Sequence, residues 1–278
     1  MAFGKKIQLF LLDGTPNGRW ICELSNWTGT AYKIPRVYVK KCETRTELQA
    51  PGVYFLFGKN DETGKDAVYI GKAEKLYNRL KQHVDGKEFW NEAICFISKG
   101  DALNKAYIKY LENRFYELAK DNQHYTIENS TVPTKSFVSE ADEAELEEFI
   151  YNAKILTNTL GHKVFESLSE ANDDTSDKHH LYISISSLKA ACVQTSEGFV
   201  LLKGSDIHNE TSKKSLHKGM VKRIEEAKNN GQVKDGKLQE DIVFSSSSAA
   251  ACFVLGYSVS GPMTWKTKDG KTLKEIES

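Results

Sequence analysis

The chain has 278 residues, of which 40% are hydrophobic, 10% aromatic and 27% charged. These values are average for globular proteins and exclude a wholly disordered, collagen-like or coiled-coil chain. At roughly 100–200 residues per domain, the length predicts two domains. Lysine and arginine balance aspartate and glutamate at 38 each, which argues against a protein that coats nucleic acid through bulk charge.

The charge is unevenly distributed along the chain. Residues 1–125 carry 20 basic and 15 acidic side chains, residues 126–175 carry 3 and 11, and residues 176–278 carry 15 and 12. An acidic segment therefore separates two mildly basic ones, and the zero total describes no single surface. The small positive excess of residues 1–125 predicts weak, salt-sensitive affinity for DNA.

Neither the cysteines nor the apolar runs indicate secretion or membrane insertion. The five cysteines are odd in number, widely spaced and never in a CxxC pair, so neither a disulfide framework nor a zinc knuckle is expected. The apolar run near the N-terminus is too short for a signal peptide, and no stretch is long enough to span a membrane. The sequence therefore predicts a soluble, cytoplasmic protein with no membrane partner.

The first 50 residues predict short strands separated by turns. The segments 7–12 and 20–24 are rich in apolar residues, turn residues lie between them, and Pro35 precedes a third such segment, RVYVK. We expect residues 1–50 to form a β-rich N-terminal extension.

The pattern sharpens after Pro51 and predicts a small antiparallel sheet flanked by helices over residues 51–165. GVYFLFG and AVYIGKA are strand-like runs separated by a loop rich in turn residues, and AICFIS can add a third strand. Leu76, Leu80 and Val84 recur every four residues, which predicts a helix between the second and third strands.

Two longer helices are expected next, one from about Asp101 to Lys120 and one over the acidic stretch that ends at Gly161. The polar residues 166–180 predict a linker. Residues 181–278 predict strands, a lysine-rich helix and a serine-capped helix, which together form a separate small domain. The predicted fold class is α+β.

Five polar residues on these elements form the candidate site. Strand alternation can place Tyr54 and Tyr69 on one sheet face. Arg79 and His83 are four residues apart and therefore stack on one side of a helix. Glu112 lies in an apolar part of the next helix, where an unpaired carboxylate is costly and a metal ion would satisfy it.

These residues resemble the GIY-YIG nuclease family. GVY at 52–54, YIG at 69–71, an arginine ten residues after Tyr69 and a glutamate in a later helix follow the family's order, with Val53 in place of isoleucine. The resemblance covers about residues 50–160. Residues 181–278 resemble a domain of unknown function often found C-terminal to such nucleases in bacterial and phage proteins.

The resemblance implies a role for each matching residue. It implies catalytic roles for Tyr54, Tyr69, Arg79 and His83, and metal binding for Glu112. Lys72 matches a lysine of some members, and Lys72 and Arg79 would contact the nucleic acid. Either Asn129 or Asn122 matches the family's late asparagine, and Asn129 is the better match.

The activity that this resemblance implies is DNA hydrolysis with Mg²⁺ or Mn²⁺, leaving 3′-hydroxyl and 5′-phosphate ends. Arg79 can donate two hydrogen bonds to non-bridging phosphate oxygens. Tyr54 could act as general base only if nearby cations lowered its pKa from about 10. RNA is an open alternative substrate. The alternative function is a non-catalytic nucleic-acid-binding or regulatory module that retains the nuclease fold.

Overall fold

The computed structural model describes residues 4–100, 102–122, 125–165, 180–185, 188–195 and 198–278. The chain divides into two compact units, residues 1–167 and 168–278, each with its own hydrophobic core. The fold class is α+β, as predicted. The predicted linker, residues 166–180, lies outside the described residues except for its last residue, His180.

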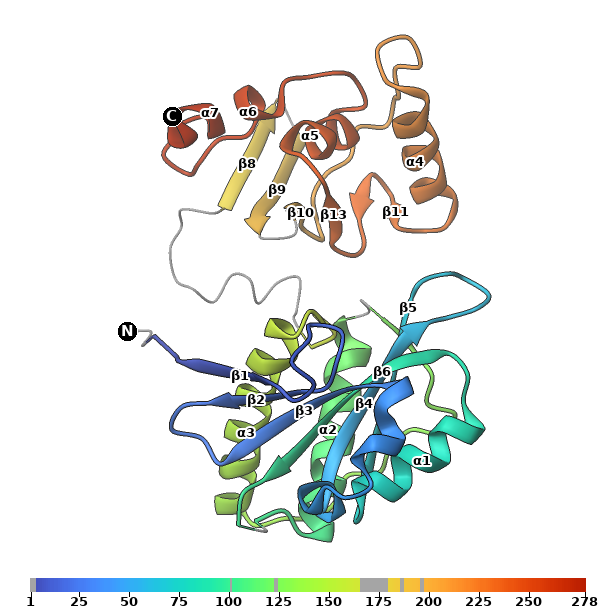
Figure 1. Ribbon diagram of the computed structural model, residues 1–278. Helices are drawn as coiled ribbons and strands as arrows, with labels where there is room; N and C mark the ends of the chain where they lie inside the picture. The colour runs from blue at the N-terminus through green and yellow to red at the C-terminus, as the bar shows by residue number, and fades with distance from the viewer. Residues whose placement is uncertain (1–3, 101, 123–124, 166–179, 186–187, 196–197) are drawn as a thin grey trace. The chain divides into compact units, whose positions relative to one another are not determined.

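A seven-stranded sheet forms the centre of the first unit (Figure 1). Its strand order is β1-β2-β3-β6-β4-β5-β7, and neighbouring strands are antiparallel except for β5 and β7. Because β3 pairs with β6, the N-terminal extension belongs to the same sheet as the strands that carry the two tyrosine motifs. The strands are β1 (Ile7–Leu11), β2 (Trp20–Leu24), β3 (Gly29–Pro35), β4 (Gly52–Lys59), β5 (Asp66–Ala73), β6 (Trp90–Ser98) and β7 (Thr126–Ile127).

Helices cover both faces of this sheet. Helix α1 (Leu76–Gly86) packs on one face with two short 3₁₀ helices, η1 (Arg36–Cys42) and η2 (Thr46–Gln49). Helices α2 (Lys105–Asn122) and α3 (Glu140–Thr159) pack on the other. We call these the α1 face and the α2 face.

Alternation along β4 builds a core on each face. Val53, Phe55 and Phe57 are buried against α2 and α3, whereas Tyr54 and Leu56 are buried with the apolar residues of α1. Burial of both faces explains why β4 is almost continuously apolar.

Two predicted elements differ in the structure. RVYVK, which was expected to be a strand, forms η1, and its buried residues Val39 and Cys42 are three apart, the period of a 3₁₀ helix. Helix α2 begins at Lys105, after Asn104, whose side-chain oxygen accepts hydrogen bonds from the backbone N–H groups of Ala106 and Tyr107. The expected cap, Asp101, lies outside the described residues.

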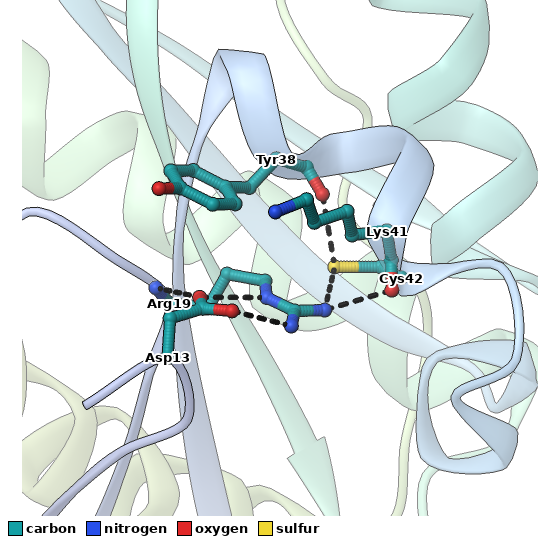
Figure 2. Close-up of polar contacts among 5 residues, drawn as sticks. All are labelled: Asp13, Arg19, Tyr38, Lys41 and Cys42. Atoms are coloured by element: carbon teal, nitrogen blue, oxygen red, sulfur yellow. Dashed lines mark hydrogen bonds and ion pairs between the residues drawn. The ribbon is translucent and has the colours of Figure 1, made fainter. Parts of the chain in front are cut away.

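An arginine fastens the N-terminal extension to η1. Nε and Nη2 of Arg19 donate to the two carboxylate oxygens of Asp13, at 3.0 and 2.8 Å, and Nη1 donates to the carbonyl of Lys41 at 2.7 Å and contacts Sγ of Cys42 (Figure 2). These bonds hold the pKa of Asp13 well below its usual value.

The second unit contains a four-stranded antiparallel sheet in the order β13-β10-β9-β8. Apolar side chains from one face of this sheet form a core with helices α4 and α5. The strands are β8 (His180–Ile185), β9 (Leu188–Thr195), β10 (Gly198–Leu201) and β13 (Ile242–Phe244), with a separate hairpin of β11 (Val233–Lys234) and β12 (Lys237–Leu238).

The helices of the second unit follow the expected capping chemistry. Ser246 caps α5 (Ser247–Leu255) by accepting from the N–H of Ala249, and Gly256 ends it in the left-handed conformation at φ 73°. The lysine-rich helix is α4 (Lys218–Asn229), and two short helices, α6 (Gly261–Thr264) and α7 (Leu273–Glu277), complete the unit. No helix among the described residues is long and apolar enough to cross a membrane.

Candidate functional site

Tyr54 and Tyr69 both lie on the α1 face. In the β4–β5 register Tyr54 is opposite Gly71 and Tyr69 is opposite Leu56, so the two tyrosines are diagonal neighbours. Their ring centroids are 6.2 Å apart. Tyr54 is fully buried, whereas Tyr69 is half-buried.

Gly71 makes room for the Tyr54 ring. A Cβ atom built at position 71 would overlap Cζ and Oη of Tyr54. Any larger residue would therefore push the phenol out of its place between the sheet and α1. The glycine of the second motif has a steric function here.

Helix α1 places two side chains on the Tyr54 hydroxyl. Nε2 of His83 is 2.7 Å from Oη of Tyr54, and Nε of Arg79 donates to the same oxygen at 3.3 Å. The His83 ring also packs against Tyr69, with 5.2 Å between centroids. Four of the predicted site residues are therefore in one cluster, which we call the tyrosine cluster.

The electrostatics of this cluster keep both Tyr54 and His83 neutral. Burial, with the positive charges of Arg79 and Lys87, lowers the pKa of His83 to about 4, so the imidazole is neutral at pH 7. Burial and the neighbouring Tyr69 raise the pKa of Tyr54 far above its ordinary value. The phenol donates to Nε2 in the tautomer of His83 that is protonated on Nδ1.

The side chains alone do not meet the condition placed on Tyr54. The sequence argument required cations to lower its pKa, and the Arg79 hydrogen bond acts in that direction, but desolvation of the phenolate outweighs it. In this structure Tyr54 is a neutral phenol, and the neutral imidazole of His83 lies next to it.

Lys72 and Glu112 lie on the opposite side of the sheet. Lys72 pairs with Val53 in the register and faces α2, because it is one residue beyond Gly71. Its Nζ is 2.6 Å from Oε2 of Glu112. Among the described residues, the hydrogen bonds and ion pairs that involve Glu112 join it to Lys72.

Glu112 therefore has a charged protein partner. Its side chain is 13% exposed, and the Lys72 ammonium supplies the compensating charge. Arg114, two residues later on α2, instead donates to Glu147 of α3 at 2.7 Å. The Lys72–Glu112 pair forms because β5 and α2 pack against each other.

Asn129 completes the edge of β5. Its Oδ1 accepts from the N–H of Ile70 at 3.0 Å, and its Nδ2 donates to the carbonyl of Ile70 at 2.8 Å. The side chain thus continues the pairing that β7 begins at Ala67 and Val68. It fixes the strand between Tyr69 and Gly71, whereas the competing Asn122 is the last residue of α2.

Glu112 provides one carboxylate for a metal ion. Within the described part of the chain, no group of three or more His, Cys, Asp or Glu side chains is arranged to hold a metal. A single carboxylate fits a hard cation such as Mg²⁺ that keeps several of its waters. A metal here would share Glu112 with Lys72.

Sequence reasoning missed two participants. Lys87 places its ammonium 4.4 Å from the centroid of the Tyr69 ring, and Gln82 accepts a hydrogen bond from Nη1 of Arg79 at 3.0 Å. Helical spacing could have found Gln82, which follows Arg79 by three residues. Lys87 follows His83 by four residues, and its N–H donates to the carbonyl of His83, so the same spacing could have found it.

Comparison with known proteins identifies the second unit only. No curated protein and no solved structure matches the chain. Residues 181–277 match the family model described as "Domain of unknown function (DUF4357)". The chain therefore carries a C-terminal domain of unknown function, preceded by a unit with the tyrosine cluster and the Lys72–Glu112 pair.

Proposed function

We propose that the first unit is a metal-dependent endonuclease that hydrolyses DNA phosphodiester bonds by the one-metal reaction of GIY-YIG nucleases. The observation that carries this proposal is the placement of one tyrosine hydroxyl between His83 Nε2 and Arg79 Nε, with Tyr69 beside it. A base, a hydroxyl and a phosphate-binding cation are thus joined in one hydrogen-bonded cluster, of which Arg79 is exposed to solvent.

The hydrogen bond between Tyr54 and Nε2 of His83 supports a proton relay through Tyr54 when His83 is protonated on Nδ1. As a water molecule attacks phosphorus, its proton passes to Oη of Tyr54 and the Tyr54 proton passes to Nε2 of His83. The water O–H bond breaks, a new P–O bond forms, and the imidazole ends protonated. The 3′ oxygen leaves with the electron pair of the broken P–O bond and takes a proton from solvent, which gives 3′-hydroxyl and 5′-phosphate ends.

Bound substrate would make His83 a stronger base. The charges of Arg79 and Lys87 help to lower the pKa of His83 in the free protein. A phosphodiester on the exposed Arg79 side chain brings a negative charge that offsets this field. Arg79 can meanwhile stabilise the charge that develops on the non-bridging oxygens.

Glu112 is the residue that would hold the metal, on the other side of β5. When bound, Mg²⁺ supplies a Lewis acid that neutralises charge on the phosphate and the leaving oxygen. Lys72, whose Nζ lies 2.6 Å from Oε2 of Glu112, would share this carboxylate with the metal and could contact a phosphate held beside it.

The proposal is tested by nicking of supercoiled plasmid DNA with Mg²⁺ or Mn²⁺. Purified protein should nick the plasmid, and Glu112→Gln should reduce the rate at least about a hundredfold, as expected when a group that stabilises the transition state is removed. Glu117→Gln is the matched control, because Glu117 is an exposed residue of the same helix. Binding without nicking in every metal would indicate the alternative, a non-catalytic nucleic-acid-binding module.

A further inference from the structure

The sheet face of the second unit that lies opposite its core is partly exposed. Val193 and Val200 on this face are fully buried, whereas Tyr182 and Ser184 at the β8 edge are at least partly exposed. Along the edge strand β8, Leu181 and Ile183 face the hydrophobic core, so Tyr182 and Ser184 face the opposite side. The ring of His180 stacks on that of Tyr182, with 6.4 Å between centroids and 23° between planes. An aromatic surface is thus present on the outer face of this sheet.

This aromatic surface borders a hollow of about 710 Å³. The backbones of Tyr182 and Lys266 exchange two hydrogen bonds, of 2.7 and 3.0 Å, which fix the 263–270 segment against the strand edge. Ile185 and Met263 add apolar surface, and both are exposed. The hollow is therefore built by backbone pairing and combines a ring with apolar side chains.

The charge that lines the hollow is positive. Lys266 and Lys268 line it, together with the hydroxyls of Ser184, Thr264 and Thr267, and none of the described lining residues is acidic. Glu275 is close enough for its charge to interact with Lys266. Its carboxylate accepts hydrogen bonds from the N–H and hydroxyl of Thr272 in the capping box of α7. The lysines are therefore available to an anionic ligand.

A second hollow of about 340 Å³ shares Tyr182 and Ser184 with the first and adds Lys189 and Lys203. The nearby carboxylates of Asp206 and Asp241 accept hydrogen bonds from the backbone N–H groups of these two lysines. These carboxylates offset the charges of Lys189 and Lys203, so the positive charge is concentrated in the first hollow, whose two lysines suit a ligand with repeated negative charges better than a single anion.

We propose that this face of the second unit binds a single-stranded nucleic acid, with an unpaired base on Tyr182 and phosphates on Lys266 and Lys268. Paired bases in a duplex do not expose their faces to a side chain, whereas single-strand-binding proteins combine aromatic stacking with a positive groove. An acidic peptide would use the lysines but has no planar base for Tyr182. The idea that this face holds a substrate for the first unit rests on the proposed function. Binding itself can be measured without cleavage.

The test is fluorescence anisotropy of a labelled single-stranded DNA dodecamer with the full chain in EDTA. Tyr182→Ala should weaken binding about tenfold, as loss of one stacked base does, and Tyr182→Phe should leave it unchanged. Lys266→Gln with Lys268→Gln should reduce the salt dependence of log K by about 0.7 for each lost phosphate contact. The matched control is Lys213→Gln with Lys222→Gln, since both lysines are at least 75% exposed.

Three results would overturn the inference: a duplex that binds as tightly as the single strand, an unchanged affinity in Tyr182→Ala, or an equal loss in the control pair. If polyglutamate displaced the single strand equally well from wild type and from Tyr182→Ala, the ligand would be an acidic peptide instead. Glu117→Gln, at an exposed position outside both sites, should bind the single strand like wild type. A wild-type protein that cuts no DNA but binds through Tyr182 would contradict the proposed function alone.

Discussion

The two faces of strand β5 carry different kinds of polar chemistry. On the α1 face, the Tyr54 hydroxyl is enclosed by His83 and Arg79 in a buried cluster of rings. On the α2 face, Lys72 and Glu112 form an ion pair that is partly exposed to solvent. The first arrangement is suited to moving a proton between neutral groups, and the second to exchanging one charged partner for another.

The largest expected effect is on DNA nicking, and it distinguishes the role of the α1 face from that of the α2 face. Arg79→Ala should reduce DNA nicking by about a hundredfold to a thousandfold, because it removes the donor to the developing phosphate charge. The Mg²⁺ concentration for half-maximal rate should stay unchanged, since Arg79 acts on the α1 face, whereas Glu112→Gln should raise it. Lys81→Ala, an exposed position on the same helix, is the control. Equal metal requirements in Arg79→Ala and Glu112→Gln would contradict the division.

A substitution at the glycine of β5 should damage the α1 face selectively. Gly71→Ala places a methyl group against the Tyr54 ring and should lower the free energy of unfolding by about 1–3 kcal/mol, with loss of activity. Urea denaturation measures the stability. Gly86→Ala is the control, because a Cβ there meets no atom within 4 Å. If both variants were equally stable, the close approach of Tyr54 to Gly71 would be wrong.

The buried imidazole should make the stability of the first unit depend on pH. The pKa of His83 is about 4 in the folded protein, below the ordinary histidine value of 6.5. Between pH 4 and 6.5 the unfolded chain therefore binds more protons than the folded one. The free energy of unfolding should therefore rise from pH 4 to 6.5 and be lost as the pH falls. In His83→Gln this slope should decrease, as measured by urea midpoints across the range. An unchanged slope would show that other groups cause the dependence.

The smallest expected effect is on stability, from a substitution at the edge of β5. Asn129→Ala removes two hydrogen bonds to Ile70 and should lower the free energy of unfolding by about 1–2 kcal/mol. Asn122→Ala, at the end of α2, should change it by less than about 0.5 kcal/mol. Chemical denaturation of both variants compares them directly. A larger loss in Asn122→Ala would reverse the choice between the two asparagines.

Local periodicity predicted most elements of the first unit. The apolar runs GVYFLFG and AVYIGKA, separated by turn residues, predicted β4 and β5, and the four-residue spacing of Leu76, Leu80 and Val84 predicted α1. Strand β3 was missed, because the glycine, threonine, lysine and proline of GTAYKIP leave no apolar run. The change from strand to 3₁₀ helix after Pro35 likewise depends on which residues tertiary packing buries.

The pairing of site residues was harder to predict than their positions. Spacing on one helix placed Arg79 and His83 together, and strand alternation placed Tyr54 with Tyr69. The Lys72–Glu112 pair joins residues 40 positions apart on different elements, and it depends on how α2 lies on β5. The pKa of Tyr54 depends on its burial beneath α1, which no local pattern reports.

The N-terminal extension determines where the first unit can be truncated. Arg36 donates hydrogen bonds to the carbonyls of Val84, Lys87 and Trp90, so the extension also holds the end of the helix that carries His83. A fragment that starts at residue 51 would lose this anchor and leave the long edge of β6 unpaired, an open template for aggregation. The motif-bearing segment is therefore not an independent module, and its folding boundary lies upstream of β1.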